Sequence, residues 1–201
     1  MRFAIAAIIL FLILPNAVQT DGILADGEWS DAEQYEVGNG NKVFMKRDKS
    51  DLYVALKGSK SPSWFHLYLS DGKRVKVMHA SAALGAINYK LNGSLWRTGD
   101  KSFVYDLRDR EFTAETAAKM DAYYAKNGWV ANNVNLGDKK TTEARINLGE
   151  FDPKYFACVI ATPEKYYSFP LDLKDSSVLT KLVQGYAVDS LAFVPGSWKK
   201  L

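Results

Sequence analysis

Apolar and polar residues alternate in short runs along most of this chain, which is the period of β-strands with one buried face. Glycine, asparagine, aspartate and proline separate the runs, as turn residues do. The runs lie at 42–46, 52–57, 64–70, 73–79, 86–91, 95–97, 103–107, 129–132, 143–148, 155–161, 166–171 and 187–194. This spacing predicts a mainly β fold, a two-sheet antiparallel β-sandwich.

One segment breaks the strand pattern and predicts an inserted α-helix. Thr113 is a good N-cap, Glu115 sits in the first turn, and Gly128 supplies the stop. The face that we expect to pack on the sandwich carries Ala117, Met120 and Tyr124. A second, short helix is predicted near the C-terminus, around 177–184.

Asp71-Gly72 lies between two alternating runs and predicts a tight β-hairpin. A two-residue loop fixes the register, because paired residues then follow directly from the turn. The predicted pairs are Ser70 with Lys73, His66 with Val77 and Trp64 with His79. The only two histidines of the sequence, His66 and His79, then share one face of the hairpin as diagonal neighbours, roughly 7–8 Å apart.

The first twenty residues predict a secretory signal peptide. Met1-Arg2 gives a positive start, 3–14 is an apolar run, and Pro15 breaks it. The run is shorter than the roughly 20 residues of a membrane span, although an uncleaved anchor is the alternative. Residues 21–201 are predicted to be one exported domain, periplasmic or extracellular, with no further span.

Composition and charge narrow the classes of function. The chain is 47% hydrophobic and 13% aromatic, which suffices for a hydrophobic core. Its 26 basic and 23 acidic residues nearly balance, and no basic run interleaves with aromatics, so nucleic-acid binding is not expected. Cys158 is the single cysteine and lies in an apolar run. It is predicted to be a buried packing residue, and the domain to fold without an internal disulfide.

Two stretches resemble the opening of family 9 carbohydrate-binding modules and their DOMON-like relatives. They are DGILADGEWSDA at 21–32 and VFMKRDKSDLYVAL at 43–56. The resemblance implies an extracytoplasmic β-sandwich that binds a ligand, either a sugar held between aromatic rings or a haem group. Trp29 of the first stretch is expected to pack under the sandwich. The matched stretches do not contain the sugar-clamping residues of that family, so the resemblance assigns no ligand-binding residue in this chain.

Carbohydrate binding is the leading functional prediction. Sugar rings stack on flat aromatic faces while their hydroxyls take hydrogen bonds at the edges. The candidate platforms are Trp64, Trp96 and Trp129, each near a loop or a strand end. His66, His79 and Ser81 are the candidate polar groups beside them.

No cofactor is assigned, and several alternatives stay open. A non-covalent haem-binding electron-transfer domain is one, because a histidine–methionine pair can bind haem iron, with His66, His79, Met45 and Met78 available. Calcium at an acidic cluster is another, from the carboxylates of Asp21, Asp26, Glu28 and Asp31. A third is an accessory domain whose ligand is another protein. No enzyme is predicted. The sequence around Ser81 lacks the glycine-flanked turn of a hydrolase, and no acidic partner for His79 can be identified from the sequence.

Overall fold

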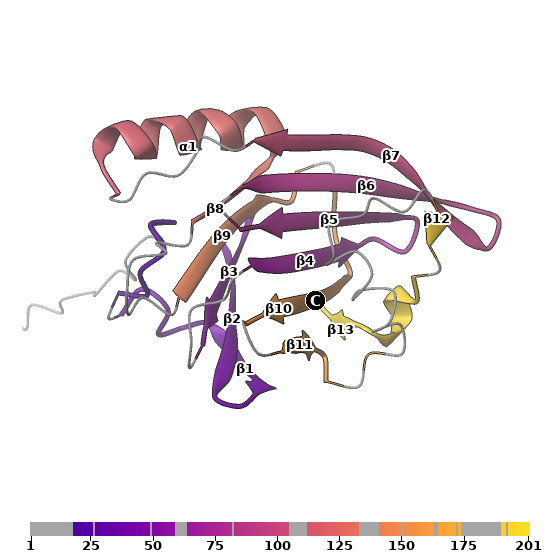
Figure 1. The fold of residues 1–201 in the computed structure, drawn as a ribbon, viewed down its shortest axis with the longest axis horizontal. Helices are drawn as coiled ribbons and strands as arrows, with labels where there is room; N and C mark the ends of the chain where they lie inside the picture. The colour runs from indigo at the N-terminus through magenta and orange to yellow at the C-terminus, as the bar shows by residue number, and fades with distance from the viewer. Residues whose placement is uncertain are drawn as a thin grey trace, which may run out of the picture.

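The computed structural model describes residues 18–25, 27–48, 50–58, 64–81, 83–104, 112–132, 141–149, 151–162, 165–171, 173, 190–191 and 193–201. They form two antiparallel sheets and one α-helix, which confirms the predicted β-sandwich (Figure 1). The predicted helix at 177–184, half of the strand predicted at 187–194 and the apolar part of the leader lie outside the described residues. Within the described part of the chain, no helix combines the length and apolar character needed to cross a membrane.

The first sheet has five strands in the order β1-β2-β3-β9-β8. Their bounds are β1 (Glu33–Gly38), β2 (Asn41–Asp48), β3 (Asp51–Lys57), β9 (Thr141–Asn147) and β8 (Trp129–Asn132). A hairpin that the sequence reading missed opens this sheet. Asn39 and Gly40 join β1 to β2 with φ of 54° and 74°, the positive values that a type I′ turn requires.

The second sheet has eight strands, seven of them in the order β11-β10-β4-β5-β6-β7-β12, with β13 also paired to β10. Their bounds are β4 (Trp64–Ser70), β5 (Arg74–Ala80), β6 (Leu84–Asn92), β7 (Leu95–Val104), β10 (Tyr155–Ala161), β11 (Tyr166–Phe169), β12 (Ser190–Leu191) and β13 (Lys199–Lys200). A short 3-10 turn, η1 (Pro195–Ser197), precedes β13. Residues 98–100, which separate the predicted runs at 95–97 and 103–107, form a bulge within one continuous strand β7, where the register against β6 shifts.

The helix α1 (Ala114–Asn127) begins and ends where the sequence predicts. The Thr113 hydroxyl accepts a hydrogen bond from the backbone N–H of Thr116 at 3.2 Å. Gly128 has φ of 68° and donates its N–H to the carbonyl of Tyr124 at 2.8 Å. Met120 is buried on the side that packs into the main core.

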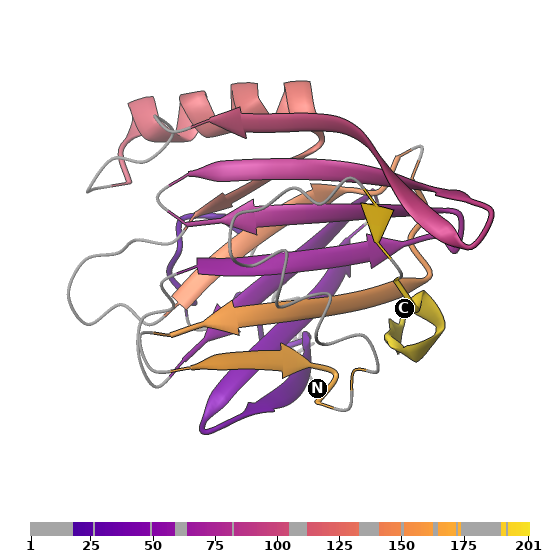
Figure 2. The same cartoon turned by 45° about the vertical axis from the view of Figure 1, so that its right-hand side comes forward.

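The main core lies between the two sheets, and each outer face carries a second hydrophobic layer. Cys158 lies in the main core, as predicted. Trp29 packs edge-on against Phe44 on the outer face of the five-stranded sheet, with ring centroids 6.3 Å apart. On the outer face of the eight-stranded sheet, Phe193 and Trp198 cover Tyr68 and other residues. The C-terminal segment that carries them, with η1 and β13, lies at one end of this sheet (Figure 2).

The β4–β5 hairpin differs from its predicted register by two residues. Ser70 pairs with Val75 rather than with Lys73, so His66 lies directly opposite His79. The loop is longer because the Asp71 carboxylate accepts the backbone N–H of Lys73 at 2.9 Å and of Arg74 at 2.7 Å. Gly72 alone in this loop has a positive φ, of 91°, so a type I′ turn does not form. A two-residue shift preserves the strand period, and the predicted faces therefore hold.

We expect Asp71→Ala to lower the free energy of unfolding by about 1–2 kcal/mol, because two backbone donors lose their shared acceptor. Asp71 also pairs with Arg74 at 2.7 Å. Urea denaturation measures the loss. Asp152→Ala is the matched control, since Asp152 is exposed and its ion pair with Arg47 is 3.6 Å long. Equal losses in both variants would contradict this role for Asp71.

Candidate functional site

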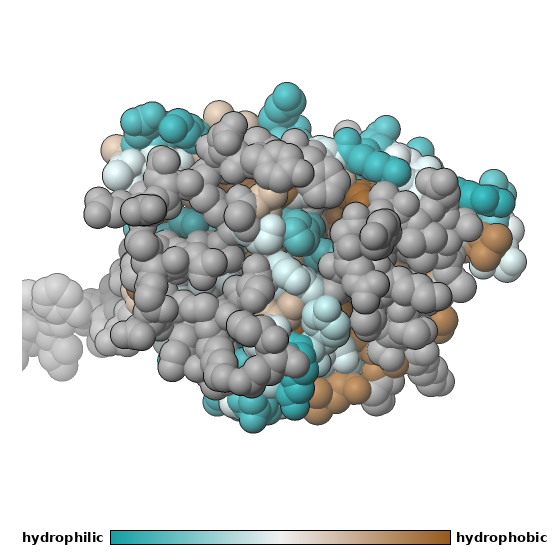
Figure 3. Space-filling view, in the orientation of Figure 1, coloured by the Kyte–Doolittle hydropathy of each residue, from teal (hydrophilic) through white to brown (hydrophobic). Residues whose placement is uncertain are grey.

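Two aromatic rings lie side by side on the outer face of the eight-stranded sheet. Ala161 of β10 pairs with Trp64 of β4 on one side and with Tyr166 of β11 on the other. Because the methyl side chain between them is small, the two rings approach to 5.4 Å between centroids. Trp64 is half-buried and Tyr166 is 48% exposed, so both present ring surface to solvent. Figure 3 shows the molecule from this side, and the described residues near its centre are pale to teal.

The two histidines form the next row across the sheet. His66 Nε2 and His79 Nδ1 share a hydrogen bond of 2.7 Å, and the rings meet edge to face at 4.8 Å. The other nitrogen of His66 contacts the Tyr68 hydroxyl at 3.1 Å. The other nitrogen of His79 contacts the Ser81 hydroxyl at 2.8 Å. Four side chains on one sheet face are thus connected in series.

The Trp64 indole adjoins this series. Its ring lies 5.2 Å from that of His66 and 6.5 Å from that of His79. Four of the six site residues predicted from the sequence, Trp64, His66, His79 and Ser81, are therefore brought together. Sequence reasoning missed Tyr166 as a platform. The signal was present in Tyr166-Tyr167, but its use required the β10–β11 register.

The electrostatics of the site keep the buried histidine neutral. His66 is 4% exposed. Its burial, and secondarily the neighbouring His79, hold the pKa of His66 well below its usual range. Both of its ring nitrogens are engaged in hydrogen bonds, so binding iron would require His66 to break one of them. Met45 and Met78 lie in the main core between the sheets. This geometry does not favour the haem alternative.

Trp96 and Trp129 do not join the site, and their burial does not fit the predicted role of exposed platforms. Trp96 is 3% exposed and donates its indole N–H to the carbonyl of Phe193 at 3.0 Å. Trp129 is fully buried and packs edge to face against Tyr123 of α1, with ring centroids 6.2 Å apart. Both indoles are core residues.

In the acidic opening stretch, the carboxylates of Glu28 and Asp31 bond to other groups of the protein. Glu28 accepts hydrogen bonds from the backbone N–H groups of Gln19 and Ala25, and Asp31 pairs with Lys46 at 2.7 Å. Glu143 of β9, which the sequence reading did not single out, accepts the Trp29 indole N–H and the Gly22 backbone N–H, each at 2.8 Å. Among the described residues, no group of three or more His, Cys, Asp or Glu side chains could hold a metal ion.

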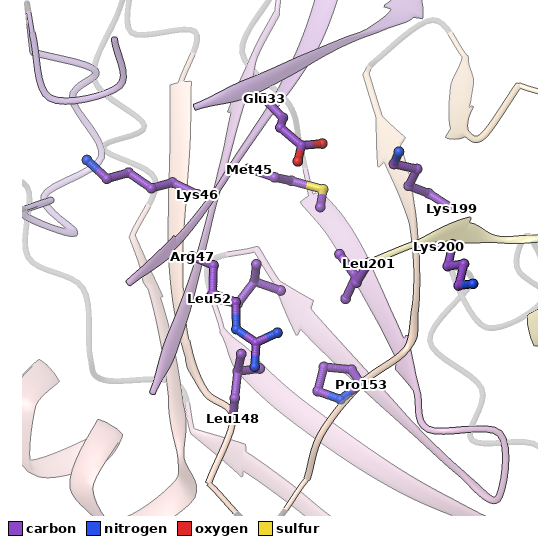
Figure 4. Close-up of a pocket in the computed structure, with 10 residues that line it drawn as sticks. All are labelled: Glu33, Met45, Lys46, Arg47, Leu52, Leu148, Pro153, Lys199, Lys200 and Leu201. Carbon is purple, nitrogen blue, oxygen red and sulfur yellow. The ribbon is translucent and has the colours of Figure 1, made fainter. Parts of the chain in front are cut away.

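A cavity of about 150 Å³ lies between residues of β1, β2 and β3 and the C-terminal residues 199–201, and neither histidine lines it (Figure 4). Met45, Leu52 and Leu201 point toward its centre, and Glu33 and Arg47 place charged groups at its margin. None of the six predicted site residues lines it. The same is true of cavities of about 280 Å³ beside Lys76 and about 170 Å³ beside Met120.

Comparison of the chain with protein-family models, with curated proteins and with solved structures gave no match. The resemblance of residues 21–32 and 43–56 to family 9 carbohydrate-binding modules and DOMON-like domains therefore stays a prediction. The surface built by Trp64, Tyr166, His66, His79 and Ser81 is the feature from which a function can be inferred.

Proposed function

We propose that this chain is an exported ligand-binding domain, periplasmic or extracellular, that binds a saccharide on the paired rings of Trp64 and Tyr166. One observation carries the proposal: two partly exposed rings lie 5.4 Å apart on one sheet face. Aromatic faces of this kind accept the C–H faces of a sugar ring and bury them from water.

The edges of the rings supply the polar contacts that a saccharide also needs. His79 and Ser81 are half-buried. The His79 ring lies 6.5 Å from the Trp64 indole, and Ser81 is hydrogen-bonded to His79 at 2.8 Å. A hydroxyl can both donate and accept hydrogen bonds, so Ser81 can bond a sugar hydroxyl while it stays bonded to His79. A sugar hydroxyl near the rim of the indole is therefore expected to bond to Ser81, with His79 holding the Ser81 hydroxyl in place. The resemblance of the opening stretch to carbohydrate-binding modules supports the same class of ligand.

Glycan-array screening of residues 21–201, followed by calorimetry on the best ligand, tests the proposal. We expect Trp64→Ala and Tyr166→Ala each to weaken binding by at least about tenfold, roughly 1.4 kcal/mol. Trp64→Phe retains a flat ring and should lose less. Phe151→Ala is the matched control, because Phe151 is a half-buried aromatic next to Arg74, away from the platform.

Binding that is unchanged in Trp64→Ala, or an array on which no saccharide binds, would overturn the proposal. Capture of a protein ligand that is insensitive to both ring substitutions would favour the accessory-domain alternative instead.

A further inference from the structure

Saccharide binding does not require four polar side chains to be connected in series, yet the outer sheet face carries such a series. It runs from Ser81 Oγ to His79 Nε2 at 2.8 Å, and from His79 Nδ1 to His66 Nε2 at 2.7 Å. It continues from His66 Nδ1 to the Tyr68 hydroxyl at 3.1 Å. The order is a hydroxyl, a histidine bonded to it, and a buried second group that orients that histidine.

The proton positions follow from the number of hydrogen bonds that each imidazole ring can donate and accept. A neutral imidazole carries one N–H donor and one acceptor nitrogen. If Ser81 donates to His79 Nε2, then His79 donates from Nδ1 to His66, and His66 donates from Nδ1 to Tyr68. In the opposite direction the Ser81 proton would have to go to the carbonyl of Ala83, which is 3.4 Å from Oγ and beyond the usual range of an O–H···O bond. The Ser81 oxygen already accepts the backbone N–H of Ala83 at 3.2 Å. The first direction, in which Ser81 donates to His79 Nε2 at 2.8 Å, therefore gives the Ser81 proton its better bond.

We infer that Ser81 is a nucleophile for acyl transfer, with His79 as its general base and His66 as the positioning residue that orients His79. A nucleophile–base–orienter set is recognised by its geometry and roles rather than by its order in the sequence. The sequence reading found no acidic partner for His79. The observed register places His66 in that position.

The reaction is hydrolysis of a carboxylic ester. Ser81 Oγ forms a bond to the carbonyl carbon while its proton passes to His79 Nε2. The adduct collapses, the C–O bond to the alcohol breaks, and His79 returns the proton to the departing alcohol. Water then attacks the acyl-serine with the same proton transfers and releases a carboxylic acid.

The surroundings of Ser81 indicate which ester fits. The last β4–β5 pair is Phe65 with Ala80, and Trp64 and Ser81 are the next residues of the two segments. The Trp64 ring lies 6.5 Å from that of His79, which is hydrogen-bonded to Ser81. A ring stacked on the indole would bring its substituents to the Ser81 hydroxyl. The substrate class is therefore an O-acylated saccharide, and this identity of the alcohol rests on the proposed function.

Labelling of the mature chain with a fluorophosphonate tests the nucleophile without any saccharide. We expect a phosphonyl adduct that peptide mapping assigns to Ser81 and that Ser81→Ala abolishes. His79→Ala should slow labelling by about 100-fold or more, the usual contribution of a general base. Ser30→Ala is the matched control, because Ser30 is exposed and outside the series. An unlabelled wild-type Ser81, or a rate indifferent to His79→Ala, would overturn the inference.

His66 is tested by rescue. His66→Leu removes the acceptor for His79 Nδ1 and should slow labelling roughly tenfold to 100-fold, less than loss of a triad carboxylate causes. His66→Gln places an amide oxygen near the same position and should recover most of the rate. A purely structural role for His66 would not distinguish the two variants once both are shown to be folded.

Turnover separates this inference from the proposed function. We expect the wild type to prefer a partially acetylated oligosaccharide over p-nitrophenyl acetate, and Trp64→Ala to lose that preference while Ser81 is still labelled. An unchanged preference in Trp64→Ala would contradict saccharide stacking and leave the nucleophile in place. A wild-type protein that binds saccharide but is not labelled at Ser81 would contradict the nucleophile and leave saccharide stacking in place.

Discussion

Glu143→Gln is expected to leave stability within about 1 kcal/mol of wild type at pH 5 and to increase it by about 3–5 kcal/mol at pH 9. Glu143 has no exposed surface. Burial raises its pKa to about 8, and the charges of Glu28 and Asp21 add to the rise against two hydrogen bonds that lower it. The folded protein therefore retains a proton that the unfolded chain releases near pH 4.5.

The sign follows from that difference. A carboxyl group with a raised folded-state pKa gives its full stability below the unfolded pKa, and this stability is lost as the pH rises toward the folded value. The loss amounts to about 1.4 kcal/mol per pH unit across the interval. The amide introduced by Glu143→Gln cannot ionise, so the variant does not undergo this loss. The amide has one acceptor oxygen for the two donors from Gly22 and Trp29, which costs the variant about 1 kcal/mol at every pH.

Urea denaturation of both proteins at pH 5, 7 and 9 measures the difference in free energy of unfolding. The comparison uses the difference in free energy of unfolding between the two proteins, because the pH dependence caused by His66 is the same in both and cancels. The lowered pKa of His66 costs both proteins stability as the pH falls below about 6.5. Glu115→Gln, in the exposed first turn of α1, is the matched control for removing one carboxylate. A difference between wild type and Glu143→Gln that stays constant from pH 5 to pH 9 would contradict the raised pKa.

The features that the sequence predicted well depend on neighbours within a few residues. The ends of α1 follow from Thr113 and Gly128, which satisfy the nearby backbone groups themselves. The shared face of His66 and His79 follows from the strand period, which the two-residue register shift does not change. The Asn39-Gly40 turn also had a local signal, and the β1–β2 hairpin was within the reach of sequence reasoning.

The features that it did not predict depend on segments far apart in the chain. Trp96 is buried because Phe193, 97 residues later, covers it. The Glu143 carboxylate accepts a hydrogen bond from Gly22, 121 residues away. A local sequence pattern contains no information about such contacts. A tryptophan near a turn is therefore predicted to be exposed, whether or not a distant segment covers it. Trp64 keeps part of its ring exposed, while Trp96 and Trp129 do not.

Trp198→Ala is expected to lower the free energy of unfolding by about 3–5 kcal/mol, the usual cost of truncating a buried tryptophan. Trp198 is 5% exposed and packs edge to face against Tyr68 and Phe193, with ring centroids 5.9 Å and 6.0 Å away. A buried indole removes about 150–250 Å² from water, which at about 25 cal/mol per Å² gives a similar magnitude. The substitution opens a cavity in the layer that covers the outer face of the eight-stranded sheet.

Trp64→Ala is the matched control, because the same side chain is removed from a half-buried position on the same face. It should cost about 1–2 kcal/mol, and equal losses in the two variants, measured by urea denaturation, would contradict the second hydrophobic layer. The pair also separates stability from function. Trp198 contacts the ring of Tyr68, which stands at the far end of the series, two hydrogen bonds beyond the Ser81–His79 bond. Trp198→Ala should therefore retain saccharide binding and Ser81 labelling below its melting temperature, while the more stable Trp64→Ala loses saccharide binding.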